Sequence, residues 1–492
     1  MVAFINKKNK SNIEIPEDII NILKTLTDAG FDSYLVGGCV RDILREKTPK
    51  DWDITTQAVP EEIQKLFVDS FYTNNFGTVG VKTNIGIVEI TPFRTEGQYT
   101  DGRRPDVVTF SKDIQEDLKR RDFTINAIAY NPLKDLYIDP FNGKTDIEKR
   151  LIKAVGSAED RFAEDGLRIL RMVRFAAQLN YSIDAETLTA GMEQKDMLSL
   201  IAKDRIRDEL VKIIMSEHAS TAFAYMKNIG ILGYITKHLE DSVNITQNGC
   251  HAYDVFEHLV RSMQCAVDKK YPLEIRLAAL LYDIGKPPTR QWVKDKKDYT
   301  FYGHEVVGAK ITKEILKDLN FSRETVEKVT KLVRWHMFFS DTEQITASAV
   351  RRMIANVGKD NIWDLMNLRI CDRVGTGRPK EDPYRLRKYM SLIEEVMSDP
   401  TDVSMLKISG QDLIDNLSLK PGPVIGKILH ILLEKALIDP KINTPEQVLI
   451  ESKSLIKLPD SDLNTLYLEA IKTKQTKETE KTKEIRKKYK VS

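Results

Sequence analysis

The chain contains few cysteines and no long apolar run. Its 492 residues include four cysteines, Cys39, Cys250, Cys265 and Cys371, and no two of them form a CxxC pair. Such wide spacing in a chain of this length argues against a disulfide scaffold or a zinc ribbon and suits a reducing cytosol. No stretch approaches the roughly 18 apolar residues that a membrane span needs, and the first residues lack the apolar segment of a secretion signal. We therefore expect a cytoplasmic protein with no membrane partner.

An excess of charge of one sign is also missing. The 75 Lys and Arg residues against 73 Asp and Glu residues leave a formal charge of +2. That is not the charge of a protein that binds nucleic acid with its whole surface. The charge is uneven, because residues 471–492 hold nine basic and three acidic side chains and carry +6, which leaves −4 for residues 1–470. This basic terminal segment has no apolar stripe, so we expect it to be disordered or a frayed helix.

What is present is the composition of a globular chain, 41% hydrophobic and 30% charged, long enough for about three domains. Up to about residue 155, helical spacing alternates with short β-branched stretches at 33–36, 51–55, 78–82 and 85–91. Beyond residue 157 the pattern is helical nearly throughout. The sequence therefore predicts an α+β head with a small mixed sheet and helices, followed by an all-helical remainder.

Two glycines stand between a predicted strand and a predicted helix. Gly37 and Gly38 follow the strand at 33–36 and precede a helix at 40–44, whose first turn carries Arg41. Glycine lets the backbone approach a phosphate closely, the start of a helix supplies N–H donors, and an arginine can pair with the phosphate. The motif indicates a phosphate site, and the alternative is a simple tight turn.

Two aspartates follow on the next predicted strand. Asp51 and Asp53 are two residues apart, so both carboxylates point to the same face. Carboxylates held side by side repel each other unless a cation bridges them, and oxygen ligands suit Mg²⁺ bound together with substrate phosphates. The pair therefore predicts a magnesium site, and the alternative is two solvated surface aspartates.

A carboxylate and three arginines share one predicted helix. Residues 161–178 have the spacing of a single amphipathic helix, in which Asp165 and Arg168 are neighbours on one face. Arg171 and Arg174 continue the same row. In isolation this pattern also fits an ordinary ion pair on a solvated helix, worth about 0.3 kcal/mol.

In this order the motifs resemble those of the class II nucleotidyltransferases, the family of tRNA CCA-adding enzymes and bacterial poly(A) polymerases. The resemblance runs through residues 33–175. It rests on the segments VGGCVRD (36–42), DWD (51–53), VEITPFR (88–94), RRDFTINA (120–127), DPFNG (139–143) and EDGLR (164–168). The stretch at 95–110, which contains GRRP at 102–105, looks like the family's flexible loop, without evident deletion.

The resemblance implies roles for individual residues. Asp51 and Asp53 would be catalytic carboxylates that hold Mg²⁺ for two-metal nucleotidyl transfer, with Glu89 as a third carboxylate beside them. The residues expected to bind the nucleotide are Gly37, Gly38, Arg41, Arg121, Asp122, Asn126, Asp165, Arg168, Arg171 and Arg174. Of these, Asp165 and Arg168 would read the Watson–Crick edge of CTP or ATP. Gly166 stands where many relatives carry Ala or Pro, and a glycine inside this helix would loosen the template, at about 1 kcal/mol relative to alanine.

Residues from about 250 to 375 resemble an HD domain. Histidines and aspartates occur in the order of that domain and could collect a metal ion for phosphoester hydrolysis. They are His258, Asp283, His304, His336 and Asp372. The doublet that names the domain is His-Asp, whereas this chain has Tyr282 before Asp283. Because a phenol is a poor substitute for an imidazole ligand, the site is degenerate and we favour a structural, tRNA-cradling body over a metallohydrolase.

The resemblance implies a CCA-adding tRNA nucleotidyltransferase. It would add CMP, CMP and AMP from CTP and ATP to the 3′ end of tRNA without a nucleic-acid template, use Mg²⁺ and release pyrophosphate. The implied division is a head at 1–155, a neck at 156–245, an HD-like body at 246–375, a tail at 376–470 and the basic terminal segment at 471–492. The oligomeric state stays open.

Three alternatives stay open beside this interpretation. The chain could be a poly(A) polymerase or add only A or only CC, although the intact loop at 95–106 disfavours the CC-only form. It could be an HD phosphohydrolase that depends on His258 and Asp283. It could also be a non-catalytic RNA-binding protein, which would have no use for Asp51 and Asp53 together.

Overall fold

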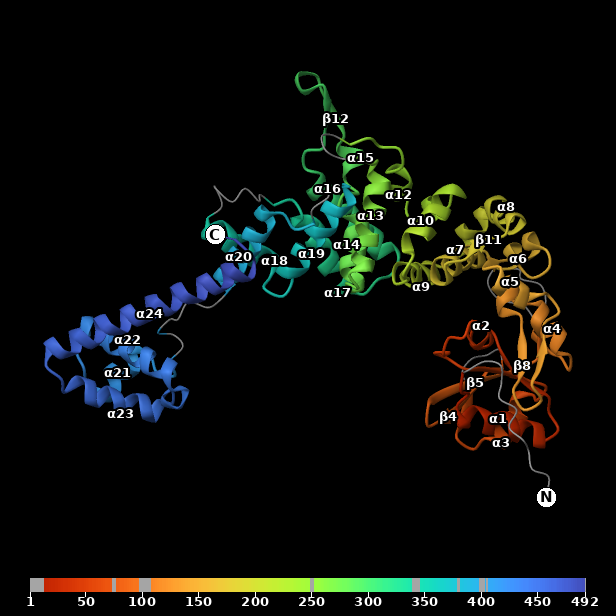
Figure 1. Ribbon diagram of the computed structural model, residues 1–492, viewed down its shortest axis with the longest axis horizontal. Coiled ribbons are helices and arrows are strands. Elements are labelled where there is room, and N and C mark those ends of the chain that lie inside the picture. The colour runs from red at the N-terminus through yellow and green to blue at the C-terminus, as the bar shows by residue number, and fades with distance from the viewer. Residues whose placement is uncertain are drawn as a thin grey trace. The chain divides into compact units, whose positions relative to one another are not determined.

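The structure is a computed structural model that describes residues 13–72, 77–96, 108–247, 252–338, 346–377, 381–397, 403 and 406–491. Its contacts group the chain into two compact units (Figure 1). The first unit comprises residues 1–336 and 371–378, and the second comprises residues 337–370 and 379–492. The expected flexible loop, with GRRP at 102–105, lies outside the described residues.

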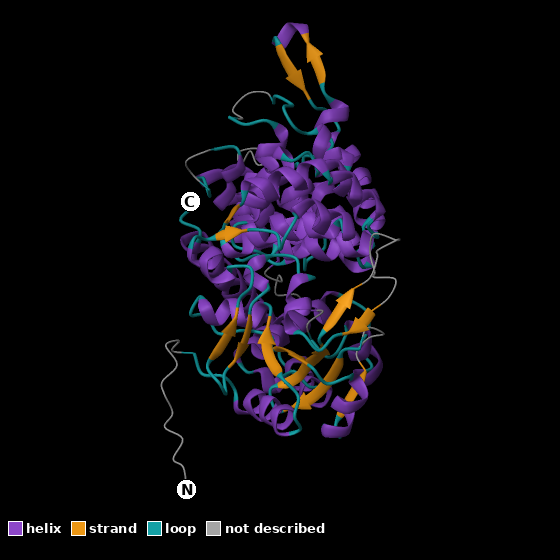
Figure 2. Cartoon of the chain, turned by 90° about the vertical axis from the view of Figure 1, so that its right-hand side faces the viewer, coloured by secondary structure: helices purple, strands orange, loops and turns teal. Residues whose placement is uncertain are grey.

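The first unit begins with a seven-stranded mixed sheet (Figure 2). Its strands, in spatial order, are β3 (Ser70–Tyr72), β4 (Val79–Thr83), β5 (Gly86–Pro92), β2 (Asp53–Thr56), β1 (Ser33–Val36), β8 (Ala129–Asn131) and β9 (Leu136–Ile138). Only β2 and β5 run parallel, and the other neighbours pair antiparallel. The mixed sheet predicted from the sequence is therefore confirmed.

Short helices and a small ribbon complete this head. They are α1 (Glu17–Asp28), α2 (Gly38–Leu44), α3 (Pro60–Leu66), α4 (Ile114–Lys119), α5 (Gly143–Glu148) and the pair β6 (Arg94–Glu96) and β7 (Val108–Phe110). Helix α1 buries one apolar face through Ile19, Leu23 and Leu26. The chain then turns at Gly30, whose φ of +89° suits glycine. Apolar spacing thus fixes which face of α1 meets the core.

The chain beyond the head is helical, as predicted. The next elements are β10 (Leu151–Ile152), α6 (Ala158–Glu164), α7 (Leu167–Leu179), β11 (Ser182–Ile183), α8 (Ala185–Glu193), α9 (Lys203–Ile214), α10 (Ala219–Asn228), α11 (Leu232–Ile235) and α12 (Lys237–Asp241). Helix α7 is buried along most of its length and contacts both α9 and α10.

The prediction of one helix over residues 161–178 is wrong, because α6 and α7 are separate. Asp165 has extended backbone angles, φ −145° and ψ 103°, and its Oδ1 accepts a hydrogen bond from the Leu167 backbone N at 3.1 Å. Gly166 lies against Met197, so closely that an added Cβ would be 2.8 Å from the Met197 carbonyl carbon. Gly166 therefore permits a close packing contact, and it does not loosen a continuous helix.

The rest of the first unit is a helical body with one hairpin. Its helices are α13 (Val255–Asp268), α14 (Leu273–Leu281), α15 (Lys286–Thr289), α16 (His304–Asp318) and α17 (Arg323–Trp335), and the end of α19 (Ile362–Gly375) joins them. The hairpin pairs β12 (Gln291–Val293) with β13 (Asp298–Thr300), and it was not expected from the sequence. Lys297 takes a left-handed conformation, φ 48°, at its turn.

The second unit is entirely helical within the described residues. Besides most of α19 it contains α18 (Ala347–Val357), α20 (Tyr384–Met397), α21 (Gly410–Leu417), α22 (Pro423–Ile438), α23 (Pro445–Ile456) and α24 (Asp460–Lys488). A continuous apolar core under α22 includes Leu413, Leu432, Val448 and Leu463. No helix of the described chain combines the length and the apolar character needed to cross a bilayer.

Of the two expectations for the basic terminal segment, disorder or a frayed helix, the structure agrees with a helix, because α24 continues to Lys488. Ile485 is buried, Arg486 pairs with Glu395 at 3.0 Å and Lys488 pairs with Glu394 at 2.7 Å. Both glutamates belong to α20 in the same unit. One apolar anchor and two ion pairs at the far end of the helix explain why a segment without an apolar stripe is helical.

Candidate functional site

Two acidic residues lie side by side on the open face of the inner strands β2 and β5, and a third precedes them in the chain. The parallel register of β2 and β5 places Glu89 directly beside Asp53. Their neighbours Ile54, Val88 and Ile90 are buried, whereas Asp53 and Glu89 lie on the open face. Asp51 is exposed two residues before β2, which begins at Asp53 and not at residue 51 as expected. The structure thus places Asp53 beside Glu89, as the resemblance implies, and leaves Asp51 in the segment before β2.

The charge of this face favours a cation. The loss of solvation by the surrounding protein raises the pKa of Asp53. The positive charge of Arg121 lowers this pKa, and the negative charges of Glu89 and Asp51 raise it further. Neighbouring negative charges repel one another, and a bound cation relieves this repulsion. Carboxylate oxygens on an open face are the donors that Mg²⁺ accepts together with phosphate oxygens. Asp51, Asp53 and Glu89 therefore offer an oxygen-only donor set of the kind that binds divalent cations.

Gly37 lets the backbone lie close to Asp53 and Arg121. Its φ of +75° suits glycine, and an added Cβ would lie 3.2 Å from Arg121 Nη1 and 3.6 Å from Asp53 Oδ2. Gly38 is the first residue of α2, and an added Cβ there would lie 3.5 Å from Arg41 Nη2. The diglycine thus lies between the carboxylates and the two arginines expected to bind phosphate.

Arg121 is positioned by an aspartate that the sequence analysis did not identify. Arg121 Nη2 donates to Asp117 Oδ2 at 3.1 Å, and Arg120 Nη2 donates to Asp117 Oδ1 at 2.7 Å. The Asp117 side chain is fully buried. Burial alone would raise its pKa, but Arg121 and Arg120 bring it below the usual value. The spacing of three and four residues on one helix was the available signal.

A buried hydrogen-bonded chain joins the head to α7. Arg41 Nη1 donates to Asn126 Oδ1 at 2.9 Å, and Asn126 Nδ2 donates to Asp122 Oδ1 at 3.2 Å. Arg171 Nε then donates to Asp122 Oδ2 at 2.8 Å. Burial would raise the pKa of Asp122, but Arg171 brings it down to about 2. Four of the residues expected to bind the nucleotide therefore form one continuous network.

Phe175 lies at the centre of three of the predicted arginines. The guanidinium carbons of Arg41, Arg171 and Arg174 lie 5.6, 5.5 and 4.2 Å from its ring centroid. An aromatic face attracts cations and holds them within reach of one another. Arg174 also pairs with Glu209 at 3.0 Å, and burial together with Arg171 lowers its pKa to about 10. Neither Phe175 nor Glu209 was identified from the sequence.

Asp165 and Arg168 are close in the chain but do not pair with each other in the structure. The Asp165 carboxylate accepts hydrogen bonds from both terminal nitrogens of Arg205, at 2.7 and 3.3 Å. Arg168 Nη1 donates to Glu164 Oε2 at 2.6 Å, and Arg168 Nη2 donates to the Arg120 carbonyl at 3.1 Å. The break at Asp165 separates the two side chains. Arg205 was missed because a partner from another helix leaves no periodic signal, whereas Glu164 has i,i+4 spacing to Arg168 and could have been found.

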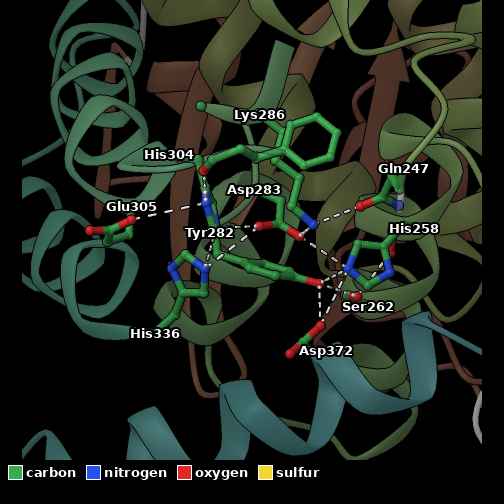
Figure 3. A network of polar contacts seen from close by, with 12 residues as sticks. Gln247, His258, Ser262, Tyr282, Asp283, Lys286, His304, Glu305, His336 and Asp372 are labelled. Carbon is green, nitrogen blue, oxygen red and sulfur yellow. Dashed lines mark hydrogen bonds and ion pairs between the residues drawn. The ribbon is translucent and has the colours of Figure 1, made fainter. Parts of the chain in front are cut away.

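The five residues of the HD-like cluster converge in the body (Figure 3). His258 Nε2 lies 3.2 Å from Asp283 Oδ2 and 3.3 Å from Asp372 Oδ1. His304 Nε2 and His336 Nε2 lie 3.2 and 3.6 Å from Asp283 Oδ1. All five side chains are buried. Their order along the chain thus correctly indicates that they meet in space.

Tyr282 is hydrogen-bonded within this cluster. Its hydroxyl donates to Asp372 Oδ1 at 3.1 Å, is bonded to Ser262 Oγ at 3.0 Å and contacts His258 Nε2. Burial and the carboxylates of Asp372 and Asp283 raise its pKa well above the usual value, so the phenol keeps its proton. The hydroxyl therefore lies against both His258 Nε2 and Asp372 Oδ1.

Lys286 neutralises the other side of the cluster. Its Nζ lies 2.7 Å from Asp283 Oδ2 and donates to Gln247 Oε1 at 2.6 Å. Burial alone would raise the pKa of Asp283, but Lys286 and the three histidines hold it well below the usual value. Burial would lower the pKa of His258, but Asp283 and Asp372 raise it to about 9. The cluster is a charged network with its own cation.

Three family models match consecutive parts of the chain. The model described as the poly A polymerase head domain matches residues 33–153. The model described as the probable RNA and SrmB-binding site of polymerase A matches residues 180–242, and the HD domain model matches residues 251–374. The resemblance stated from the motifs is confirmed.

The chain is also similar to solved structures of CCA-adding enzymes. One is the Bacillus stearothermophilus CCA-adding enzyme in complex with CTP, with a TM-score of 0.56, 23% identity and coverage of 94% of this chain and 98% of that chain. Another is the Thermotoga maritima enzyme complexed with tRNA, with a TM-score of 0.50, 20% identity and coverage of 90% and 97%. These likenesses show the fold.

Sequence relatives extend the comparison to most of the chain. The CCA-adding enzyme of Lactobacillus delbrueckii subsp. bulgaricus is 48% identical over 217 residues, which span 43% of this chain and about half, 54%, of that protein. The CCA-adding enzyme of Leuconostoc mesenteroides is 32% identical over 85% of this chain and 91% of its own length. The CCA-adding enzyme of Leuconostoc citreum (strain KM20) is 47% identical over 88% of this chain and 95% of its own length. Similarity of this extent, over head, RNA-binding and HD segments in one order, shows that the chain belongs to the family of CCA-adding enzymes.

Proposed function

We propose that this protein adds CMP, CMP and AMP from CTP and ATP to the 3′ end of tRNA, without a nucleic-acid template and with release of pyrophosphate. The observation that carries the proposal is the position of Asp53 beside Glu89 on the open face of the sheet, with Arg121 and Gly37 next to Asp53. The proposal is supported by relatives named CCA-adding enzymes and by solved relatives that hold CTP or tRNA.

Asp51, Asp53 and Glu89 are proposed to hold magnesium. When bound there, Mg²⁺ would stabilise the attacking and leaving oxygens of the nucleotidyl transfer. The three carboxylates supply the oxygen ligands from an open face, so substrate phosphates can complete the coordination. Arg121 is held in place by buried Asp117, so it can orient the triphosphate with little loss of side-chain entropy.

The residues proposed to bind the rest of the nucleotide belong to the network around Phe175. Arg41 and Arg171 are joined through Asn126 and Asp122, and Arg174 is held against the Phe175 ring. Guanidinium groups fixed in this way form a positively charged surface that can donate hydrogen bonds to phosphate and sugar oxygens. Gly38, the first residue of α2, lets the backbone approach the same site.

Asp165 and Arg168 are proposed to select the base. Cytosine and adenine both present an amino donor next to a ring-nitrogen acceptor, which an acceptor carboxylate and a donor guanidinium complement. Uracil and guanine present the opposite pattern and would leave a buried polar group unpaired, at a cost of about 1–3 kcal/mol. Arg205 orients Asp165, while Glu164 and the Arg120 carbonyl orient Arg168.

The division into head, neck, body and tail is proposed to follow the boundaries expected from the sequence. Family-model matches that end at residues 153, 242 and 374 support the boundaries at 155, 245 and 375.

The test is to incubate tRNA that lacks its 3′ CCA with labelled nucleotides and to sequence the product. We expect CCA from CTP and ATP, no extension from UTP or GTP, and loss of incorporation in Asp53→Ala by at least about 10³-fold. Asp32→Ala is the matched control, because Asp32 is a half-exposed aspartate of the head that pairs only across 3.5 Å with Lys134. A poly(A) product, a single added nucleotide or undiminished incorporation by Asp53→Ala would overturn the proposal.

A further inference from the structure

The HD-like cluster divides into two halves that share Asp283. One half contains His258, Asp283 Oδ2 and Asp372, and the other contains Asp283 Oδ1, His304 and His336. Each half could in principle hold a metal ion. The two halves differ in whether a phenol and an ammonium group lie among their ligand atoms (Figure 3).

The half with His258 does not fit a metal ion. The Tyr282 hydroxyl contacts both His258 Nε2 and Asp372 Oδ1, and it donates to the latter at 3.1 Å. The Lys286 ammonium lies 2.7 Å from Asp283 Oδ2. A cation in this half would have to displace both a phenol O–H and an ammonium group. The replacement of the usual histidine by Tyr282 therefore closes this half.

The half with His304 and His336 has the opposite character. His304 Nδ1 lies 2.7 Å from the Phe301 carbonyl oxygen, and His336 Nδ1 lies 2.7 Å from the Val333 carbonyl oxygen. A carbonyl oxygen can only accept, so each Nδ1 carries the hydrogen and, in a neutral imidazole, each Nε2 is a lone pair. A backbone carbonyl that fixes the histidine tautomer is the outer partner that metal-binding histidines use.

Three acceptors therefore face one another in this half. His304 Nε2 lies 3.3 Å from His336 Nε2, and Asp283 Oδ1 lies 3.2 and 3.6 Å from these two atoms. Ligand atoms about 2.1 Å from a common ion are about 3.0–3.4 Å apart; two of the three separations lie in this range and the third is longer, at 3.6 Å. The exposed fractions of Asp283, His304 and His336 are 2%, 7% and 4%, so bulk water does not separate them.

We propose that Asp283, His304 and His336 bind one divalent transition-metal ion, and that Tyr282 confines the cluster to this single ion. Two imidazoles and one carboxylate suit Zn²⁺, Fe²⁺, Co²⁺ or Mn²⁺ better than Mg²⁺. The ion is structural, because its ligands are buried and come from three elements. Asp283 follows α14, His304 begins α16 and His336 ends α17, so the ion ties these helices together.

The test measures metal content and stability in the full-length protein and does not depend on nucleotide transfer. The protein is stripped with a chelator and dialysed against Co²⁺ in a large excess of Mg²⁺, which occupies the oxygen-only site of the head. We expect about one Co²⁺ per chain, the visible absorption of nitrogen-ligated Co²⁺, and a Tm about 5 °C above that of the stripped protein.

Matched variants assign the ion to one half. His304→Gln and His336→Gln should each lose the ion, its absorption and the rise in Tm. His258→Gln should keep all three, and Tyr282→Phe should keep them too, since the hydroxyl is not a ligand. Circular dichroism and CCA addition serve as folding controls for every variant.

Three results would overturn the proposal. The first is a wild-type protein that binds no Co²⁺, which would mean that a proton on one histidine satisfies the cluster. The second is loss of the ion in His258→Gln or Tyr282→Phe. The third is retention of the ion in both His304→Gln and His336→Gln.

Discussion

At the scale of single residues, glycines determine how closely the backbone approaches its neighbours. The hydrogen-bond partners of the candidate site residues determine how those side chains are oriented. Gly37 and Gly166 both stand where a side chain would meet other atoms within 3.2 Å, but for different reasons. At Gly37 the neighbours are functional side chains, whereas at Gly166 the neighbour is the backbone of Met197. A flexible side chain can yield to a new Cβ, but a packed backbone cannot without moving its helix.

Replacement of Gly166 by alanine should therefore destabilise the protein. Its Cβ would lie 2.8 Å from the carbonyl carbon of Met197, and we expect a loss of about 1–3 kcal/mol in unfolding free energy, measured by thermal and urea denaturation. Gly426→Ala is the control, because Gly426 lies in α22 with no atom within 4 Å of an added Cβ. It should leave stability equal or about 1 kcal/mol higher. Equal effects of the two substitutions would contradict the packing argument.

Arg205 should influence the choice of nucleotide without contacting the metal site. Arg205→Met keeps the length of the side chain but removes two hydrogen bonds that orient Asp165. We expect the preference for CTP and ATP over UTP and GTP, measured as a ratio of kcat/KM, to fall by about tenfold. Arg207→Met on the same helix α9 is the matched control, since Arg207 pairs with Asp208. An unchanged ratio in Arg205→Met would show that Arg205 does not position Asp165.

At the scale of elements, the sequence predicts those helices and strands that are encoded by local residue patterns. The strand at 33–36, the diglycine and helix α2 appear where expected, because β-branched residues and glycines are local signals. The break between α6 and α7 was missed because Phe162, Leu167 and Leu170 keep helical spacing across Asp165. The hairpin β12–β13 was missed because its strands have only three residues each. Partners such as Arg205 and Lys286 emerge only from tertiary packing.

The link between η1 (Thr124–Asn126) and α7 should respond to acid. The pKa of Asp122 is about 2 in the folded protein and about 3.9 in an unfolded chain. Because the folded value is the lower one, its contribution is complete above about pH 4 and is lost as the pH falls toward 2. The shift corresponds to about 2 kcal/mol.

Asp122→Asn should remove this part of the acid dependence. Hydrogen–deuterium exchange of α7 should increase between pH 4 and pH 2 in the wild type after correction for intrinsic rates, and change less in the variant. Asp32→Asn is the exposed control and should behave as the wild type. Identical pH dependence of Asp122→Asn and the wild type would exclude this coupling.

At the scale of the whole molecule, the chain carries two ligand sets of different character. The head offers carboxylates on an open sheet face, whereas the body offers buried imidazoles around Asp283. The total charge of +2 reveals neither, because it averages the acidic cluster, the arginines around Phe175 and the basic end of α24. Motif order predicted both places, but only the coordinates show that Tyr282 and Lys286 already fill half of the HD-like cluster.

Metal removal should separate the two sites. Chelation should abolish nucleotide incorporation and lower Tm together. Addition of Mg²⁺ alone should restore incorporation by more than about half without restoring Tm, whereas Co²⁺ should restore Tm. Parallel measurements of incorporation and thermal unfolding check this. Restoration of both properties by Mg²⁺ alone would mean that one oxygen-rich site accounts for them.

The chain of hydrogen bonds from Arg41 to Arg171 also limits how the enzyme can move. A rotation of α7 against the sheet would pull Arg171 away from Asp122, whose side chain is only 8% exposed. Separating a buried ion pair costs several kcal/mol, so this joint is stiff. The backbone at Asp165 is extended, and its restraints, the Arg205 ion pair and the packing of Gly166 on Met197, do not involve the sheet. If Asp165 and Arg168 select the base as proposed, a pivot that serves both cytosine and adenine therefore belongs at the α6–α7 break and leaves the arginines around Phe175 stationary.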